Sequence, residues 1–289
     1  MRVLMLGGTG LTGPFAVRRL AALGHQVTAI SPREAGAGQK LPPAERSADV
    51  VIHTWLMTEA DAGAFVDAFR GRAARAVVIS SGDVYRAYGR LTGKEPGPPD
   101  PVPLAEDAPL RESRYPYGGD YEKILVEQTC QGQSEMPVTI LRYPAVYGPN
   151  DSYRFRSWLK PMLDGLSEIA LPDTFAAWRW THAYCEDVAE AVVLAAVNPR
   201  ASGRTYNVGE AETPPWAERL ERMAAAIGWT GRIRIRPVRE FPEDQQFPPD
   251  PRQDLTMGTR RLREELGYRE VVPADEGYRR TAAWAKAIK

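Results

Sequence analysis

The chain begins with a strand-like segment that runs directly into a glycine-rich turn. Residues 2–6 are mostly apolar, Gly7, Gly10 and Gly13 follow at three-residue spacing, and residues 15–23 have helical periodicity. Glycines at such a turn let backbone N–H groups and a helix N-terminus approach a pyrophosphate, which larger side chains would block. The strand–turn–helix context therefore predicts a dinucleotide-binding site here, with Thr9 and Leu11 of the same turn beside the cofactor.

Composition narrows the class of protein further. A chain of 289 residues suits one large domain, or a core domain with a smaller lobe. It has 37 basic and 37 acidic residues, so no broad field favours nucleic acid or anionic lipid. Two cysteines and three scattered histidines predict neither a disulfide framework nor a metal site. We expect no signal peptide, no membrane partner and a cytoplasmic location, because the first strand follows Met1 directly and no apolar run reaches bilayer length.

Strand-like and helical segments alternate through the first half of the chain. The predicted strands are residues 2–6, 26–30, 49–53, 76–80 and 138–142, and the clearest helices after the first are residues 59–69 and 121–131. This alternation indicates an α/β fold with a parallel sheet and helices on both faces. About twenty residues separate the second strand from the third, so one sheet element is expected to be shortened or missing.

Several segments together resemble the extended short-chain dehydrogenases/reductases, the nucleotide-sugar epimerase/dehydratase family. They are GGTGLTG from Gly7, VVISSGDVY at 77–85, Pro116-Tyr117-Gly118 with Lys123, LRYPAVYGPND at 141–151, WTHAYCEDVAEAV at 180–192 with GRTYNVGE at 203–210, and LREELGYREVVPADEGYRRTAAW at 262–284. The resemblance implies a Rossmann-type doubly wound parallel sheet in residues 1–150 and a smaller C-terminal substrate lobe in residues 151–289. Residues 180–208 would return to the core domain, and the family suggests a homodimer.

The same resemblance assigns catalytic roles. In this family a serine holds the substrate oxygen, a tyrosine exchanges the proton, and a lysine lowers the pKa of the tyrosine and binds the nicotinamide ribose. Ser81 and Lys123 match the serine and the lysine. A nearby cation stabilises phenolate, which brings a group with a reference pKa of about 10 into working range.

The tyrosine departs from the family pattern. Its position, four residues before the lysine, is occupied by Gly119. Tyr117 keeps the family context, and the neighbouring Pro and Gly residues would let its ring swing inward. Tyr121 lies roughly 200° around an ideal helix from Lys123 and would point elsewhere unless the helix starts later. We favour Tyr117 narrowly over Tyr121, and a third interpretation is that no tyrosine serves.

The end of the second strand bears on the choice of coenzyme. NAD enzymes usually carry Asp or Glu there to hold the ribose 2′-OH, whereas this chain has Ser31 followed by Pro32 and Arg33. A hydroxyl and a guanidinium suit a 2′-phosphate, so NADP is preferred to NAD. By their places at strand ends and in the resembling loop, His53, Tyr143 and Val146 are also expected beside the cofactor.

Residues for the substrate are expected in the motifs and in the lobe. The candidates are Asp83, Tyr85, Tyr147, Arg179 and Asn207. Trp178, Arg179 and Trp180 form an aromatic and basic cluster that could stack on a sugar or a base, and packing explains tryptophan equally well.

Three functions remain in competition. The leading one is an NAD(P)-dependent oxidoreductase or epimerase that moves hydride at a carbinol or ketone carbon of a small molecule, for example a nucleotide sugar. The second is a dinucleotide-dependent binding or sensor protein without catalysis, which Gly119 in the tyrosine position motivates. The weakest is a dehydratase, because Gly82 stands where relatives of that type carry a carboxylate.

Overall fold

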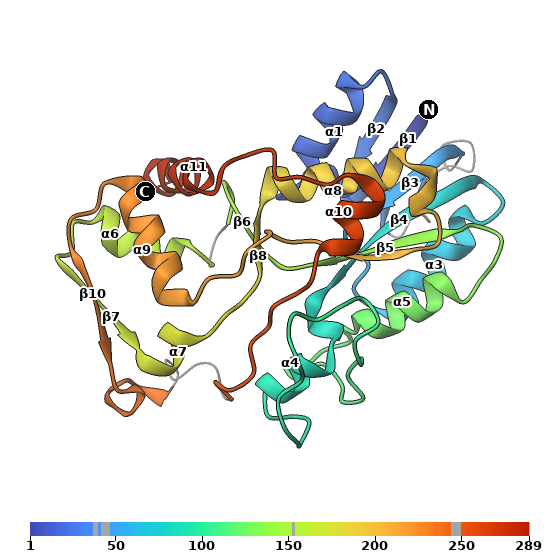
Figure 1. Ribbon diagram of the computed structural model, residues 1–289. Coiled ribbons are helices and arrows are strands. Elements are labelled where there is room, and N and C mark those ends of the chain that lie inside the picture. Colours follow the sequence, from blue (N-terminus) through green and yellow to red (C-terminus); the bar gives the residue numbers. More distant parts are fainter. Residues whose placement is uncertain (37–39, 42–46, 152–153, 244–249, 289) are drawn as a thin grey trace.

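A parallel sheet lies at the centre of the computed structural model, which describes residues 1–36, 40–41, 47–151, 154–243 and 250–288. Within that part of the chain the sheet has six strands in the order β2-β1-β3-β4-β5-β9, and every neighbouring pair is parallel (Figure 1). The strands are β1 Arg2–Leu6, β2 Gln26–Ile30, β3 Ala48–His53, β4 Ala73–Ser81, β5 Val138–Tyr143 and β9 Thr205–Asn207. The predicted Rossmann-type fold is confirmed.

Helices cover both faces of this sheet. The long helices of the core are α1 Gly13–Ala22, α3 Glu59–Phe69, α5 Lys123–Gln131 and α8 Cys185–Val197. Side chains alternate along β1, so that Val3 and Met5 pack with α1 and α8, whereas Leu4 and Leu6 pack with α3 and α5. Strands that are buried on both faces explain the continuous apolar runs of the sequence.

The connection between β2 and β3 is short, as the sequence indicates. Its only described helix is α2, Pro32–Ala35, and the rest of the connection lies largely outside the described residues. β2 consequently forms one edge of the sheet.

Helix α5 begins later than the sequence predicts. Its first residue is Lys123 rather than Tyr121, because Glu122 takes the N-cap position and accepts a hydrogen bond from the backbone N–H of Ile124. This two-residue difference decides where Tyr121 lies.

The second half of the chain builds a smaller lobe at one side of the sheet. Its elements are β6 Ala145–Tyr147, α6 Arg156–Leu163, β7 Glu168–Pro172, α7 Asp173–Ala177, β8 His182–Tyr184, α9 Trp216–Ile227, β10 Arg232–Arg236 and α11 Ala274–Ala287. Parallel pairs β6–β8 and β7–β10 form two small sheets within the described residues. Trp158, Phe175, Trp178 and Trp216 pack against one another in its interior, and Trp180 packs against Trp178 and His182. Trp178 and Trp180, which could have stacked on a ligand, therefore serve packing.

Parts of the second half return to the core. Helix α8 packs along α1, β9 adds a strand beside β5, and α10 (Arg260–Leu266) contacts both β9 and α8. The remaining helix, α4 (Arg86–Leu91), follows the end of β4 through a short 3-10 turn at Gly82–Val84.

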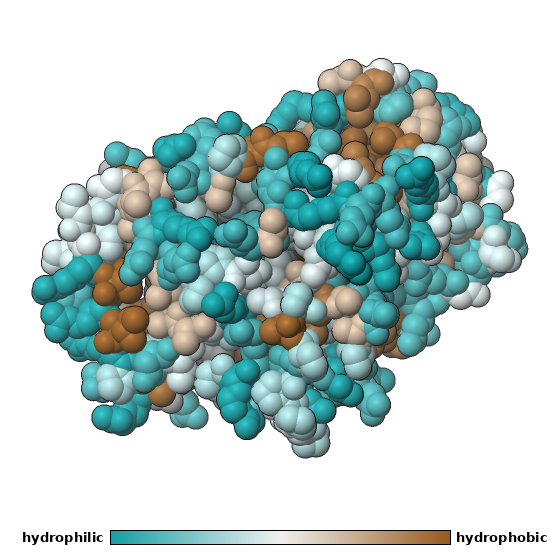
Figure 2. All heavy atoms as spheres, viewed as in Figure 1, coloured by the Kyte–Doolittle hydropathy of each residue, from teal (hydrophilic) through white to brown (hydrophobic). Residues whose placement is uncertain are grey.

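The visible surface is mostly hydrophilic, with scattered hydrophobic spots near the ends of β1, β2 and α1 and at the far end of the lobe (Figure 2). Among the described residues, no helix has the length and apolar character needed to cross a bilayer.

Candidate active site

A cleft of about 670 Å³ opens at the carboxyl edge of the sheet. Its walls come from the residues that follow β1, β2, β3, β4 and β5, together with the N-terminus of α5 and the segment after β6. Ligands of doubly wound sheets bind at this edge, where the connections from adjacent strands turn to opposite faces. Here that point lies between β1 and β3.

The glycine turn forms one end of the cleft, and its backbone segments lie very close to one another. Gly7 has φ 103°, a conformation that other residues rarely adopt, and its N–H donates to Ile30 O at 2.8 Å. A Cβ on Gly13 would lie 2.5 Å from the carbonyl carbon of Gly8, so glycine there lets α1 start directly against the turn.

Gly10 differs from Gly13, because the surrounding protein atoms would leave room for a side chain at position 10. A Cβ there would come no nearer than 3.6 Å to a protein atom, yet Gly10 lines the cleft. Its missing side chain therefore keeps the cleft open. Helix α1 has no acidic residue in its first turn and no side-chain cap, so its N-terminal dipole faces the cleft without a competing anion from the helix. These features fit a dinucleotide pyrophosphate.

The end of β2 supplies a hydroxyl and a cation. Ser31 and Arg33 line the cleft, and Ser31 exchanges hydrogen bonds with Glu34, which does not line it. Among the described lining residues, Arg33, Lys123 and Arg154 are cationic and none is a carboxylate. The charge of the cleft suits an anionic ligand.

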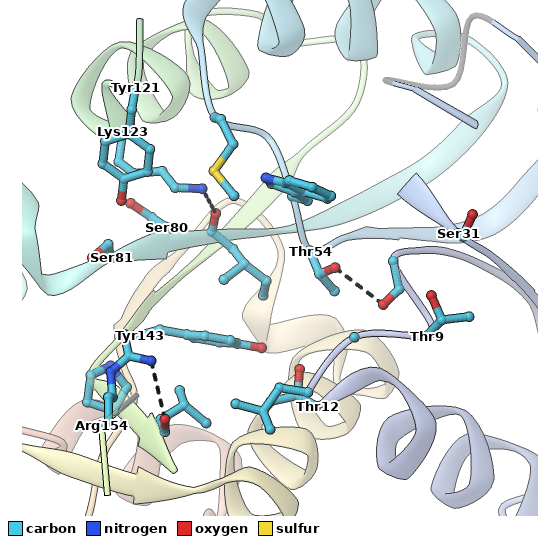
Figure 3. A pocket seen from close by; sticks show the side chains of 18 of the residues that line it. Thr9, Thr12, Ser31, Thr54, Ser80, Ser81, Tyr121, Lys123, Tyr143 and Arg154 are labelled. Atoms are coloured by element: carbon cyan, nitrogen blue, oxygen red, sulfur yellow. Dashed lines mark hydrogen bonds between the residues drawn. The ribbon is translucent and has the colours of Figure 1, made fainter. Parts of the chain in front are cut away.

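Ser81, Tyr121 and Lys123 meet at the other end of the same cleft. Figure 3 shows these three side chains grouped together, while Thr9 and Ser31 lie at the opposite end of the pocket. Ser81 is the last residue of β4, and Lys123 is the first of α5. The Nζ of Lys123 lies 5.7 Å from the centre of the Tyr121 ring.

Lys123 is held firmly in place. Its Nζ donates to the backbone carbonyl oxygens of Leu56 and, at 3.2 Å, Ile79. Burial lowers the pKa of Lys123 to about 8, against the opposing effect of Asp83 and Glu127. The ammonium group is thus held by the segment after β3 and by β4, and Lys123 lines the cleft.

The expectation that Tyr117 turns inward is wrong. The Tyr117 side chain is 62% exposed and lies outside the cleft lining, whereas Tyr121 lines the cleft. Positive φ at Gly118 (84°) and Gly119 (73°) turns the chain ahead of α5. Because α5 begins only at Lys123, Tyr121 lies before the helix, and the 200° separation expected for two residues of one helix does not apply.

Asp83 was expected to bind the substrate, but it does not line the cleft. It contacts the hydroxyl of Tyr121 instead. Its Oδ2 accepts a hydrogen bond of 2.7 Å from the Tyr121 hydroxyl. Burial raises the pKa of the Asp83 carboxyl, and burial together with Asp83 raises the pKa of Tyr121. Tyr121 is therefore a neutral phenol at physiological pH, unlike the tyrosine that the family resemblance implies.

Two further candidates for the substrate belong to a buried network. The Tyr85 hydroxyl donates to Asn207 Oδ1 at 2.6 Å and accepts from Arg142, which forms an ion pair of 2.7 Å with Glu127. Both Tyr85 and Asn207 are fully buried, and neither lines the cleft. The network joins β5, β9 and α5 below the site, because buried polar groups must find partners. Tyr85 and Asn207 therefore belong to the buried network beside the cleft and not to its lining.

Three more candidate residues lie outside the cleft lining. Tyr147 is 1% exposed and stacks with Phe155 in the lobe. Arg179 lies on the surface, where it donates to the carbonyl oxygen of Thr213. His53 is buried at the end of β3, and its Nδ1 accepts the backbone N–H of Trp55. Burial lowers the pKa of His53 to about 4.

The other cofactor candidates do reach the cleft. Gly7, Thr9, Gly10, Leu11, Ser31, Arg33, Tyr143 and Val146 all line it, and Gly13 supports it from behind. The sequence reasoning missed Thr12, Thr54, Trp55 and Met57, and it considered Arg154 for a diphosphate but did not select it. Thr54 and its neighbours directly follow β3, so a search of the residues after every parallel strand would have found them. Arg154 carries no comparable signal.

Known proteins match this chain over most of its length. The model of the "NAD dependent epimerase/dehydratase family" matches residues 3–209. 2'-Dehydrokanamycin reductase from Streptomyces kanamyceticus is 29% identical over 254 residues, which cover 79% of this chain and 67% of that protein. The "Uncharacterized protein YbjS" of Escherichia coli (strain K12) is 27% identical over 183 residues, or 56% of this chain, and the match spans only about half of that protein (54%).

Solved structures share the fold at low identity. A short-chain dehydrogenase/reductase superfamily protein from Agrobacterium tumefaciens with bound NAD has a TM-score of 0.72 at 20% identity, covering 99% of this chain and 98% of that one. UDP-glucuronic acid 4-epimerase from Bacillus cereus, in complex with UDP-glucuronic acid and NAD, has a TM-score of 0.71 at 18% identity and full coverage of both chains (100%).

Proposed function

The chain belongs to the NAD-dependent epimerase/dehydratase family, and from this premise we propose that it is an NAD(P)-dependent oxidoreductase or epimerase that acts at a carbinol or ketone carbon. One observation carries the proposal. Ser81, Tyr121 and Lys123 line the same cleft as the glycine turn. A coenzyme that lies along this cleft would reach from the turn to the three catalytic side chains.

Each part of the cleft has a role in this proposal. The glycine turn and the N-terminus of α1 hold the pyrophosphate, and a bound nicotinamide coenzyme supplies the hydride acceptor or donor. Lys123 lines the cleft and would bind the nicotinamide ribose. Ser81 holds the substrate oxygen, and Tyr121 exchanges its proton, by general acid–base catalysis.

We also propose NADP as the preferred coenzyme. The support is Arg33, which lines the cleft at the end of β2, and the lack of a carboxylate among the described lining residues. A guanidinium binds a 2′-phosphate through charge-assisted hydrogen bonds, whereas a carboxylate there would favour the free hydroxyl of NAD. Homodimer formation, the cytoplasmic location and the domain boundaries at residues 150 and 180–208 stay predictions.

The substrate is a small carbonyl compound or alcohol in this account. The names of two similar proteins give two classes to try: a dehydro-aminoglycoside, from 2'-dehydrokanamycin reductase, and a nucleotide sugar, from UDP-glucuronic acid 4-epimerase.

The test is an assay of the purified protein with NADPH, NADH, NADP and NAD against a panel of both classes. Ser81→Ala and Lys123→Met should each lower turnover strongly, while Ser167→Ala, at an exposed serine of the lobe, should not. Undiminished turnover in both cleft variants contradicts the assigned roles. Tight coenzyme binding with no turnover on any substrate would instead favour the sensor protein, the alternative that Gly119 at the family's tyrosine position motivates.

A further inference from the structure

Asp83 is the one buried carboxyl group in contact with the proposed catalytic tyrosine among the described residues. Its side chain is 8% exposed, and its Oδ2 accepts the Tyr121 hydroxyl at 2.7 Å. Its Oδ1 is also buried and has no hydrogen-bond partner in the described part of the chain. A buried carboxyl oxygen without a partner is costly as part of a carboxylate and much less so as part of a carboxylic acid.

The backbone holds Asp83 rigidly. Its N–H donates to Ser81 Oγ at 3.3 Å, and its carbonyl oxygen accepts from Arg111 Nε. Arg111 in turn forms an ion pair of 2.8 Å with Glu122, the N-cap of the helix that starts at Lys123. The serine, the tyrosine and this carboxyl group therefore form one connected unit.

We propose that Asp83 is a positioning residue that exchanges, through Tyr121, the proton that the substrate oxygen loses or gains. The proposal rests on the proposed function. In the direction of oxidation, the substrate O–H bond breaks and its proton binds the Tyr121 oxygen. At the same time the Tyr121 O–H bond breaks and its proton binds Asp83 Oδ2. Tyr121 begins and ends neutral, Asp83 changes from carboxylate to acid, and the hydride goes to the bound coenzyme. Reduction reverses each bond change.

This relay explains how a tyrosine can act when it is not readily ionised. A free phenolate at Tyr121 would stand 2.7 Å from Asp83 Oδ2 and would place two negative charges together. Passing one proton on while accepting another avoids that charge. Tyr121 can reach both the substrate oxygen and Asp83, because it lines the cleft and its hydroxyl contacts the Asp83 carboxyl group.

The groups around Asp83 act in opposite directions. Burial raises its pKa, whereas the hydroxyls of Tyr121 and Ser81 and the charges of Arg111 and Lys123 lower it, and burial prevails. Glu122 offsets much of the charge of Arg111. Tyr88, on the adjoining helix α4, is half-buried and interacts with Asp83, and burial raises the pKa of Tyr88, so its phenol is neutral. Asp83 can therefore take up a proton at a higher pH than an ordinary aspartate.

The first test needs no substrate or coenzyme. Protein labelled with ¹³C at the aspartate carboxyl carbons is titrated by NMR, and Asp83→Asn identifies the signal. We expect the Asp83 carboxyl to titrate above the ordinary aspartate range, and Tyr121→Phe to move it higher still, since a donated hydrogen bond is lost. Asp120→Asn removes the same charge from the exposed loop next to Tyr121 and should leave the signal in place. An ordinary pKa that Tyr121→Phe does not change overturns the proposal.

The second test separates proton exchange from shape. Asparagine at position 83 still offers an oxygen to the Tyr121 hydroxyl but cannot take up its proton, so Asp83→Asn should lower kcat about 100-fold with little change in KM. Its pH profile should lose the limb that Asp83 sets. A kcat for Asp83→Asn within about threefold of the wild type would show a structural role and overturn the relay. Binding of NADPH, measured by calorimetry, tells this result apart from failure of the proposed function, which would abolish binding in the wild type as well.

Discussion

The two ends of the cleft are built on different principles. At the coenzyme end, Gly7, Gly10 and Gly13 shape the backbone of a single short turn. The other end, which we call the proton-exchange end, is formed by Ser81, Tyr121 and Lys123. Ser81 and Tyr121 come from segments forty residues apart and are joined through Asp83. Binding at the coenzyme end depends on the absence of side chains from the turn, whereas proton exchange at the other end depends on where the side chains are placed. A change at the first should alter binding, and a change at the second should alter the rate.

The largest expected effect contrasts two tyrosines four residues apart. Tyr121→Phe should lower kcat by about 10²- to 10⁴-fold, because the hydroxyl in the cleft is lost. Tyr117→Phe should leave kcat unchanged, since that side chain is 62% exposed and outside the cleft. Steady-state kinetics on the same substrate measure both. The opposite pattern would return the role to Tyr117.

A side chain at Gly10 should act on binding alone. Gly10→Val places atoms in the cleft and should weaken coenzyme binding about 100-fold, while the fold tolerates the change because no protein atom lies within 3.4 Å of its Cβ. Calorimetry with each coenzyme measures the effect. Gly63→Ala, within α3 and with open space around its Cβ, should keep full affinity and add about 0.5–1 kcal/mol of stability. Unchanged binding in Gly10→Val would move the coenzyme away from the turn.

Arg33 should set the choice between the two coenzymes. Arg33→Ala should weaken NADP binding about tenfold and leave NAD binding nearly unchanged, since only NADP carries the 2′-phosphate. Arg18→Ala removes an exposed arginine on α1, outside the cleft, and serves as the matched control. An equal loss for both coenzymes would remove the 2′-phosphate role.

The most gradual expected effect is on stability at the end of the cleft that holds Lys123. The pKa of Lys123 is lowered from 10.5 to about 8, so above pH 8 the folded protein binds fewer protons than the unfolded chain. The free energy of unfolding of the wild type should therefore rise, relative to Lys123→Met, by about 1 kcal/mol per pH unit between those two values. Urea unfolding at a series of pH values measures it. A difference that stays flat or falls over this range would contradict the burial of the charged group.

The same contrast explains what the sequence could predict. Five of the six described sheet strands and the glycine turn were predicted because their signals are local: apolar runs of strand length, and glycines between a strand and a helix. The sixth strand, β9, was not predicted, because it has only three residues. The position of Tyr121 was not, because it depends on where α5 begins. Glu122 sets that point, and it is held by Arg111, eleven residues earlier.

Two of the substrate candidates lie outside the cleft for another reason. Tyr85 and Asn207 have the polar groups of a binding site, yet they bond to each other inside the protein. Residue type alone does not distinguish a buried polar pair from a pair of residues in a cleft, because both need hydrogen-bonding groups.

A crystal structure with bound NADP would test the central claim most directly, since it shows both ends of the cleft at once. We expect the pyrophosphate against Gly7 to Gly13, the 2′-phosphate beside Arg33, and the nicotinamide beside Tyr121 and Lys123. A coenzyme bound away from the glycine turn, or a nicotinamide beyond the reach of Tyr121, would contradict the account.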